Sequence, residues 1–407
     1  MPERAYQSLV ISGAGITGLT LAVALKRSLG SALDVTVYDP MVGSLRTSGR
    51  ASAIAAGPRR MLEALEIWPV IEARGQPIKS MIVSDSKLGD AVRPVYLRFE
   101  GEIEPGLPFA HMVEDDDLLA ALLEAARSSG VGLVAQAVQN VRNKSGYIEA
   151  QLDSDTLVKT DLIVAADGAQ SILRKQMGIA TTGWAYEQAG IVATLSHEFA
   201  HEGRAEEHFL AQGPFAVLPL TDNRISIVWT QSLQDARLAL TLSETEFVEK
   251  VQALIGWHLG EMRLLGKPRV FPLRLQIARE LIAPRFALIG DAAHVIHPIA
   301  GQGLNLGLRD VAALAETICA QSQLGLDIGA PEILEAYQRQ RRFDTVTMAA
   351  TTDILNRLFS NQSTPLRMLR DLGLGVVDRL PGLKRFFMHE AGGVGDSSGK
   401  LLKGVWP

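Results

Sequence analysis

The chain has 407 residues, 47% of them hydrophobic, which is enough for about two to three packed domains. Its formal net charge of −5, without blocks of Lys or Arg, excludes a protein that binds nucleic acid through a basic surface. Its single cysteine, Cys319, excludes an intrachain disulfide and favours a reducing compartment, so we expect a cytoplasmic protein.

The first ~40 residues have the pattern of a βαβ unit. An apolar run at residues 8–12 is followed at once by glycines, and apolar residues then recur at helical spacing over residues 19–25. A second apolar run, residues 35–38, ends at Asp39. This order predicts a strand, a tight turn, a helix and a second, parallel strand.

Gly13, Gly15 and Gly18 match the dinucleotide-binding pattern G-x-G-x-x-G. The first glycine allows the tight turn, the second lets the backbone approach a pyrophosphate, and the third lets the helix pack on the strand. The unpaired N–H groups of the helix then point at the phosphates. Asp39, 21 residues after Gly18, is placed to accept hydrogen bonds from a ribose. Ordinary turn glycines are the alternative, which the strand, the helix and Asp39 in register disfavour.

Two later apolar runs, residues 162–166 and 286–289, are expected to be buried strands of the same sheet. Each ends at an acidic residue or at its flanking glycine. Between them, residues 190–195, 215–220 and 224–230 are rich in β-branched residues and are separated by turn signals. This pattern predicts a separate sheet domain inserted into the nucleotide-binding domain.

Residues 290–307, GDAAHVIHPIAGQGLNLG, combine an acidic strand end, a Pro-containing turn and a glycine-rich helix start. Asp291 could bind the ribityl hydroxyl groups of a flavin, or it could cap a helix. Gly301, Gln302 and Gly303 would open a helix whose positive end favours negative charge on a reduced flavin ring. Glycine is expected there because a flat ring must approach bare backbone.

Three more residues of this segment are candidates for the same site. Pro298 and Ala300 would line the edge of the ring without competing polar groups. Asn305 could be a polar contact to the flavin or an ordinary first-turn helix residue. Together with the upstream segment DGAQSILR, residues 167–174, these loops predict a site for flavin adenine dinucleotide (FAD).

The segments GAGITG (13–18), DGAQSILR (167–174) and GDAAHVIHPIAGQGLN (290–305) resemble the FAD-dependent aromatic-ring hydroxylases. Within that family, residues 200–220 and 297–317 are most similar to the hydroxylases of ubiquinone biosynthesis, in particular to those that act on 2-octaprenyl-6-methoxyphenol.

This resemblance implies a set of site residues. The FAD-binding residues would be Gly13, Gly15, Gly18, Asp39, Arg50, Asp167, Arg174, Gly290, Asp291 and Asn305. The residues beside the reacting ring would be Pro298, Gly301, Gln302 and Gly303. In the family, the element with Asp167 and Arg174 supports both FAD and NAD(P)H. The chain departs from the family in having Asp39 for the usual Glu, and Asp115, Asp116 and Asp117 where relatives often place an Arg or a polar residue.

The resemblance also implies an α/β fold, with a Rossmann-like FAD-binding domain, an inserted mixed β-sheet substrate domain and a helical C-terminal region. This is the p-hydroxybenzoate hydroxylase-like arrangement. The expected domains are residues 1–75, 101–180 and 271–330 for FAD, residues 76–100 and 181–270 for the substrate sheet, and residues 331–407 for the helical region.

The activity that the resemblance implies is hydroxylation of the aromatic ring of a polyprenylated phenol by O₂, through a flavin C4a-hydroperoxide. NAD(P)H would be the reductant. Tyr186, His201 and His208 are candidates for a base that assists ionisation of the phenol. Because this substrate is so apolar, we expect delivery by a lipid-delivery factor or other ubiquinone-biosynthesis proteins, or contact with the inner face of a membrane. The resemblance also allows an oligomer. Residues 365–403, basic with interspersed apolar residues, could form such a contact or pack as ordinary helices.

Other functions remain as alternatives. Residues 197–201, HEFAH, match the zinc-protease pattern H-E-x-x-H, but the preceding residues are strand-like, so we expect no metal site. His294 and His297 are likewise expected to be turn residues near the cofactor. A related flavoprotein that hydroxylates another aromatic compound or reduces a prenyl lipid is the nearest rival. A non-catalytic escort protein with a flavin-binding fold is a more distant one.

Overall fold

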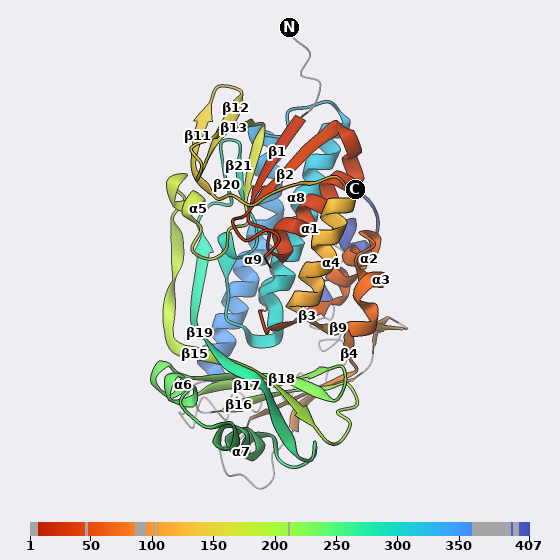
Figure 1. The fold of residues 1–407 in the computed structure, drawn as a ribbon, viewed down its shortest axis with the longest axis vertical. Coiled ribbons are helices and arrows are strands. Elements are labelled where there is room, and N and C mark those ends of the chain that lie inside the picture. Colours follow the sequence, from red (N-terminus) through yellow and green to blue (C-terminus); the bar gives the residue numbers. More distant parts are fainter. Residues whose placement is uncertain are drawn as a thin grey trace.

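The computed structural model describes residues 7–44, 48–85, 95–100, 102–104, 106–210, 212–359, 392–393 and 399–407. Two sheets dominate it (Figure 1): one lies among helices in the upper half of the view, and a broad second sheet lies in the lower half. The long helix α9 (Pro331–Phe359) runs between the two halves. The molecule therefore has two bodies, an upper and a lower one in this view.

The upper sheet has the strand order β10-β2-β1-β14-β21-β20 within the described residues. Its strands are β1 (Gln7–Ser12), β2 (Leu33–Tyr38), β10 (Gly132–Val134), β14 (Leu162–Ala165), β20 (Ile282–Ala283) and β21 (Phe286–Leu288). β1 pairs in parallel with β2 and β14, and β14 pairs in parallel with β21. The expectation that residues 162–166 and 286–289 contribute strands to the sheet of the first βαβ unit is confirmed.

Burial on both faces explains the apolar runs of this sheet. Leu9, Val10 and Ile11 are successive residues of β1 and all are buried, because helices cover both sides of a parallel sheet. Helix α1 (Ile16–Leu29) is buried over residues 18–25, where it packs between the sheet and two other helices. Those helices are α4 (Asp115–Ser128) and α8 (Gln302–Gln323).

The lower sheet has the strand order β22-β19-β15-β18-β17-β16-β5-β6 in the described part of the chain. Its strands are β5 (Ser80–Asp85), β6 (Val95–Glu100), β15 (Thr181–His197), β16 (Arg204–Leu210), β17 (Gly213–Leu220), β18 (Arg224–Ser232), β19 (Met262–Ala278) and β22 (His294–Val295). β19 runs across residue 271, where we expected a domain boundary, and the short strand β22 brings the loop after β21 to the edge of this sheet.

The two faces of the lower sheet have different neighbours. Helices α6 (Leu233–Ala239) and α7 (Glu244–Ile255) cover the outer face, where Phe215, Trp229 and Phe247 belong to one apolar cluster. α7 begins with a capping box between Ser243 and Glu246. The inner face is turned toward the upper body (Figure 1).

The remaining elements connect the two bodies or cap the upper one. They are β3 (Ala51–Ala55), β4 (Gln76–Ile78), β7 (Glu102–Glu104), β8 (Leu107–Pro108), β9 (Ala110–Glu114), β11 (Val138–Lys144), β12 (Tyr147–Leu152), β13 (Leu157–Thr160), α2 (Ala56–Ala64), α3 (Trp68–Ile71) and α5 (Ile172–Gln176), with short 3₁₀ turns at Gly30–Ala32, Glu72–Arg74, Gly290–Ala292, Ile299–Gly301 and Leu401–Lys403. β3, β9 and β4 form a small sheet that lies against the inner face of the lower sheet.

Among the described residues, no helix has both the length and the apolar character needed to cross a membrane. Most of the stretch 365–403, which we expected either to contact a membrane or to pack as ordinary helices, lies outside the described residues.

Candidate active site

The fingerprint loop between β1 and α1 is closely packed at two of its three glycines. Gly13 has a φ of +111°, and a Cβ there would lie 2.3 Å from the carbonyl oxygen of Ala166, the residue after β14. A Cβ on Gly18 would lie 2.1 Å from the carbonyl oxygen of Gly13. No side chain fits at either position, so these glycines let the turn form and bring α1 against the sheet.

Gly15 differs from these two glycines. It is exposed, and nothing lies within 4 Å of the place where its Cβ would be. It is also the N-cap of α1, and no side chain caps the helix there. The backbone amides of the first turn thus face open space, which suits the pyrophosphate of a dinucleotide.

Asp39 follows β2 and is bonded to the fingerprint loop. Its Oδ2 accepts a hydrogen bond from the backbone amide of Ala14 at 2.9 Å, and its Oδ1 accepts one from the amide of Met41 at 2.7 Å. Each carboxylate oxygen can accept more than one hydrogen bond, so the side chain can still receive a ribose hydroxyl group. Two backbone amides thus fix the orientation of the carboxylate.

The loop after β21 and the start of α1 meet at Thr17. Gly290 has a φ of +61°, and a Cβ there would lie 2.9 Å from Thr17 Oγ1. A Cβ on Gly307 of α8 would lie 2.7 Å from Thr17 Cγ2. Both glycines therefore leave room for one threonine, and the three segments converge at this point.

Asp291 is the exposed residue of the converging loop, in the short 3₁₀ turn Gly290–Ala292. Its side chain caps no helix, and its carboxylate has no hydrogen-bond or salt-bridge partner in the part of the chain that the structure describes. The geometry therefore gives no support to the capping alternative and leaves the carboxylate open to a ligand.

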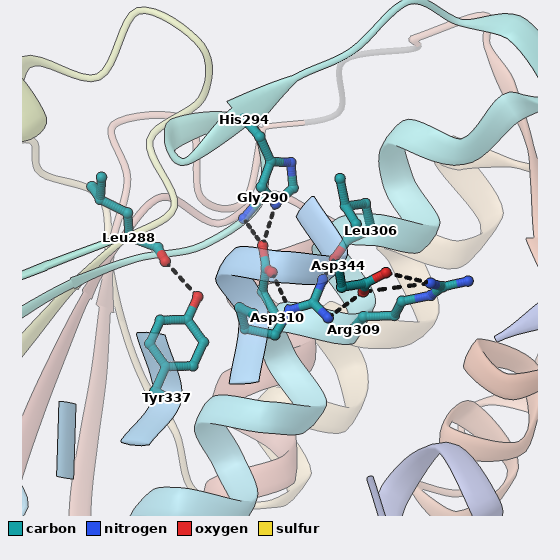
Figure 2. Close-up of polar contacts among 9 residues, drawn as sticks. Leu288, Gly290, His294, Leu306, Arg309, Asp310, Tyr337 and Asp344 are labelled. Atoms are coloured by element: carbon teal, nitrogen blue, oxygen red, sulfur yellow. Dashed lines mark hydrogen bonds and ion pairs between the residues drawn. The ribbon is translucent and has the colours of Figure 1, made fainter. Parts of the chain in front are cut away.

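Asp310 of α8 forms hydrogen bonds that hold this loop in place (Figure 2). Its carboxylate accepts hydrogen bonds from the backbone amide of Gly290 at 3.0 Å, from His294 Nε2 at 2.6 Å and from Arg341 Nε at 2.7 Å. Burial alone would raise the pKa of Asp310, but His294 and Arg341 outweigh it, so the pKa lies below the ordinary carboxyl value.

Two further contacts complete the attachment of α9 to this site (Figure 2). Arg341 also pairs with Asp344, which in turn binds Arg309 of α8 at 3.1 Å. The Tyr337 hydroxyl group donates to the carbonyl oxygen of Leu288 at 2.7 Å. α9 thus fixes both the end of β21 and the loop that follows it.

Asn305 joins the start of α8 to β3. Its Nδ2 donates to the carbonyl oxygens of Ala53 at 2.8 Å and Gly301 at 3.1 Å, and its Oδ1 accepts from the amide of Ala55 at 2.9 Å. The amide is thus used within the protein, which makes Asn305 a positioning residue for the turn that opens α8.

The turn that opens α8 ends at a residue with a left-handed backbone conformation. Gly301 has a φ of +62° and is the N-cap of α8, and its amide donates to the carbonyl oxygen of Pro298 at 3.0 Å. A Cβ on Gly303 would have nothing within 4 Å, whereas Gln302 is largely buried. The N-terminus of α8 consequently presents bare backbone, as a flat ring requires.

Arg174 holds the segment after β14 against the same loop. Its side chain is buried, Nη1 donates to the carbonyl oxygen of Ala292 at 2.7 Å, and Nη2 donates to that of Ala169 at 3.1 Å. Burial raises the pKa of Asp167, although contacts with Ser171 and nearby backbone amides oppose it. Arg174 thus joins the segment after β14 to the loop after β21.

Arg50 lies at the border with the lower sheet. It is exposed, its guanidinium lies 5.6 Å from the ring centroid of Phe271 of β19, and its Nε lies 3.7 Å from Asp115 Oδ2. Asp115, Asp116 and Asp117 are the acidic residues in which the chain departs from its family, and each has a partner within the protein. Asp115 binds Ser52, Asp116 accepts from the amide of Ser48, and Asp117 pairs with Arg74. They also lie in the first turn of α4, where negative charge is favourable.

The candidate histidine sites do not form a metal centre. The HEFAH segment lies at the end of β15 and in the following turn, where His197 Nδ1 contacts the Phe199 carbonyl oxygen at 2.8 Å and His201 Nε2 contacts that of Leu220 at 2.7 Å. Within the described ranges, no group of His, Cys, Asp or Glu side chains is arranged to hold a metal ion. The segment thus lies on a strand end and a turn rather than on a helix, as its strand-like sequence predicted.

The candidate bases Tyr186, His201 and His208 each have a hydrogen-bond partner within the protein. His208 Nε2 is bonded to Glu206 at 2.9 Å on the outer face of the lower sheet. The Tyr186 hydroxyl group donates to Asp353 of α9 at 2.7 Å, and burial with this contact raises the pKa of Tyr186.

Two buried residues have surroundings that sequence reasoning did not predict. The ring of His297 has no exposed area and lies 5.3 Å from the ring of Tyr186. Among the described residues neither of its nitrogens has a hydrogen-bond partner, and burial lowers its pKa to about 4. The other residue is Glu207 of β16. The pair Glu206-Glu207 contained a signal for it, because adjacent strand residues face opposite sides and one carboxyl must be inside.

Comparison with known proteins identifies the family. Residues 6–351 match the model of the family described as FAD binding domain. The ubiquinone hydroxylase UbiL of Rhodospirillum rubrum is 39% identical over 98% of this chain and 92% of its own length. The mitochondrial ubiquinone biosynthesis monooxygenase COQ6 of Drosophila melanogaster is 32% identical over 95% of this chain and 89% of its own.

Solved structures show the same fold. The p-nitrophenol 4-monooxygenase PnpA from Pseudomonas putida superposes with a TM-score of 0.78 and 17% identity, covering 95% of this chain and 98% of that one. Klebsiella pneumoniae HpxO complexed with FAD and uric acid gives 0.75 and 19%, covering 95% and 99%. The α/β fold with an FAD-binding domain and a mixed sheet is thereby confirmed. The chain therefore belongs to the FAD-dependent monooxygenase family that includes UbiL and the COQ6 proteins.

Proposed function

We propose that this protein hydroxylates the aromatic ring of a polyprenylated phenol in ubiquinone biosynthesis, with O₂ as co-substrate and NAD(P)H as reductant. The observation that carries the proposal is the convergence of the fingerprint helix, the loop after β21 and the start of α8 at Thr17, in a chain whose relatives are named for ubiquinone hydroxylation. We further propose the division into FAD, substrate-sheet and C-terminal helical regions, with the boundaries given above.

The residues that surround the convergence fit FAD. Gly15 would leave the pyrophosphate next to the first turn of α1, and Asp39 would accept a ribose hydroxyl group. Asp291 would accept hydroxyl groups of the ribityl chain, and the backbone from Gly301 to Gly303 would lie beside the ring. When bound, FAD supplies the electrons and the activation of O₂ that the hydroxylation needs.

The chain supplies positioning, charge and exclusion of water. The positive end of α8 favours negative charge next to its first turn. The inner face of the lower sheet packs through Ala205 and Leu220 against the β3, β9 and β4 sheet, which joins the start of α8 at Ala53. An apolar wall at this place would hold a prenylated ring and keep water from the reacting groups.

The compartment and partners belong to the same proposal. A cytoplasmic protein would need a lipid-delivering partner or contact with the inner face of the membrane to receive such a substrate. Residues 365–403 would be the first place to test, by comparing liposome flotation of the full chain with that of a chain ending at residue 364. Equal flotation would exclude a membrane contact through this segment.

Precursor analysis would test the function itself. A strain that lacks the gene should accumulate a prenylated phenol with one ring hydroxyl group fewer than its product, and the wild-type chain should remove it. The purified yellow protein should consume O₂ and NADH or NADPH in the presence of that phenol. An unchanged precursor pool, or turnover that reduces a prenyl double bond without O₂ uptake, would contradict the proposal.

A further inference from the structure

Two neighbouring carboxyl groups of β16 have opposite environments. Glu206 faces the outer side, where it binds Arg204 Nε at 2.8 Å, His208 Nε2 at 2.9 Å and His258 Nε2 at 3.0 Å. Burial alone would raise the pKa of Glu206, but hydrogen bonds from the two histidines hold it well below the ordinary value. Glu207 is the next residue, and strand geometry points its side chain to the other face.

The register of the sheet shows which residues share that inner face. Glu207 lies opposite Ala216 of β17, which lies opposite Val228 of β18, and Glu207 lies beside Val83 of β5. Directly opposed strand residues point to the same side of a sheet. The carboxyl group is therefore set in a row of small apolar side chains.

This face is the one that meets the FAD-binding body. Ala205, two residues before Glu207 on the same face, packs in a cluster with Ala53 of β3. Ala53 accepts the hydrogen bond from Asn305, and its Cβ is the nearest atom to a Cβ built on Gly301. Glu207 thus lies on the surface that covers the start of α8.

Within the described residues, no side chain or backbone group forms a hydrogen bond or salt bridge with the Glu207 carboxyl group, and the residue is only 5% exposed. Burial is the single cause that raises its pKa, to about 8. The group is therefore mainly a neutral carboxylic acid at neutral pH, with one O–H donor and one carbonyl acceptor. A buried polar group without a partner destabilises a protein, so an apolar residue would serve the fold better.

We propose that Glu207 is the polar contact for the ring hydroxyl group of the phenolic substrate, on the inner face of the lower sheet. A phenol hydroxyl group is both a donor and an acceptor, which matches the two functions of the neutral acid. The apolar row around it suits the ring and its alkyl substituents. This inference rests on the proposed function and deepens it, because it names the residue that distinguishes a phenol from a ring without the hydroxyl group.

Paired ligands would test the contact on the FAD-loaded protein. The probes are a short-chain 2-prenyl-6-methoxyphenol and its O-methyl ether, which lacks the phenolic proton. Their dissociation constants follow from the change in the flavin absorption spectrum. Wild type should bind the phenol about tenfold more tightly than the ether, as expected for one buried hydrogen-bonding pair.

Variants of Glu207 should change this ratio in a defined order. Glu207→Leu keeps the volume but removes both polar functions, so the ratio should fall to about one, whereas Glu207→Gln keeps a donor and an acceptor and should retain most of the preference. Glu207→Ala replaces Glu207→Leu as the test if the leucine variant does not load FAD. The control is Glu249→Gln on the exposed side of α7, which should leave the ratio unchanged.

The possible outcomes separate the two proposals. A wild-type preference that persists in Glu207→Leu, or in Glu207→Ala, would overturn the role of Glu207 while leaving the function intact. A yellow wild-type protein that binds neither probe and hydroxylates no prenylated phenol would overturn the proposed function, and the contact with it. A merely structural role would change the unfolding midpoint but not the ratio.

Discussion

Asp310 accepts a 2.6 Å hydrogen bond from His294 Nε2, and this contact joins α8 to the loop that follows β21. The same carboxylate binds the amide of Gly290 and the guanidinium of Arg341. One fully buried charge thus has three donors, two from the loop after β21 and one from α9. The loop that carries Asp291 is therefore positioned by groups that do not touch a ligand.

Replacing Asp310 with Asn should destabilise the fold and weaken flavin retention. The amide removes the charge that faces Arg341 and places an N–H group where an acceptor is needed. We expect a loss of about 3 kcal/mol, as for other buried ion pairs that lose one partner. Urea unfolding and the ratio of flavin to protein absorbance would measure both effects.

Glu335→Gln on α9 is the matched control for this change. It breaks an exposed i,i+4 pair with Arg339 and should cost no more than about 0.5 kcal/mol. If Asp310→Asn were as stable and as yellow as this control, Asp310 would not organise the loop.

Gly13 and Gly15 should respond differently to the same substitution. Gly13→Ala forces a methyl group against Ala166 at a positive φ, so we expect a loss of at least about 2 kcal/mol in the free energy of unfolding. Gly15→Ala has space and an ordinary φ of −75°, and its stability should stay within about 0.5 kcal/mol of wild type.

The Gly15→Ala methyl group would nevertheless stand where the pyrophosphate approaches, so FAD affinity should fall roughly tenfold or more. Titration of the apoprotein with FAD, followed by flavin fluorescence, would measure it. Unchanged affinity in a folded Gly15→Ala variant would place the pyrophosphate elsewhere.

Asp291→Ala should reduce FAD affinity while leaving the fold intact. The carboxylate is exposed and has no partner among the described residues, so its removal breaks no contact there. Losing a charged acceptor for hydroxyl groups should weaken binding roughly tenfold to a hundredfold. Asp34→Ala, at an exposed position of β2, controls for loss of one negative charge. A fully loaded and active Asp291→Ala enzyme would refute the ribityl contact.

The stability of the protein should carry a pH dependence that depends on Glu207. Burial raises the pKa of this carboxyl group from 4.5 to about 8 in the folded chain, so between these values the folded state holds a proton that the unfolded state has released. The free energy of unfolding should therefore fall as pH rises from 5 to 8, by up to about 1.4 kcal/mol per pH unit from this group.

Glu207→Gln cannot ionise and should lack this contribution. The stability difference between wild type and Glu207→Gln should widen with rising pH, with the variant the more stable of the two. Urea unfolding at four values between pH 5 and 8 would show it. Parallel curves would mean that Glu207 is ionised and has a partner that the structure does not show.

The sequence allowed the central part of the fold to be predicted because a parallel sheet buries both faces. Its strands, such as residues 162–166 and 286–289, are uninterrupted apolar runs, and the glycines before α1 mark the turn. The length of β15 was not predictable in the same way. Its first part, from Thr181 to Ala185, is exposed and pairs with β19 at the edge of the lower sheet, where no burial pattern marks a strand.

The partners of the site residues were harder to predict, because they lie far apart in the chain. Asn305 and Arg174 have side chains that could contact a ligand. In the structure, however, Asn305 is hydrogen-bonded to β3, 250 residues earlier in the chain, and Arg174 to the carbonyl oxygen of Ala292. The sequence did not single out Asp310, because a lone Asp in an amphipathic helix is typical of a solvated face. Asp310 is buried because α9 packs against α8 and contributes Arg341 as its partner.

The order of strands in the upper sheet determines when the protein can acquire its cofactor during synthesis. β1 is translated before its neighbour β14, which ends at Ala165, and β21, the other neighbour of β14, ends only at Leu288. The antiparallel strands from β16 to β18, each next to its neighbour in sequence, can form on the nascent chain in the meantime. The fingerprint glycines are translated long before α8, which carries Gly301 at its start, so we expect FAD loading to follow the synthesis of α8.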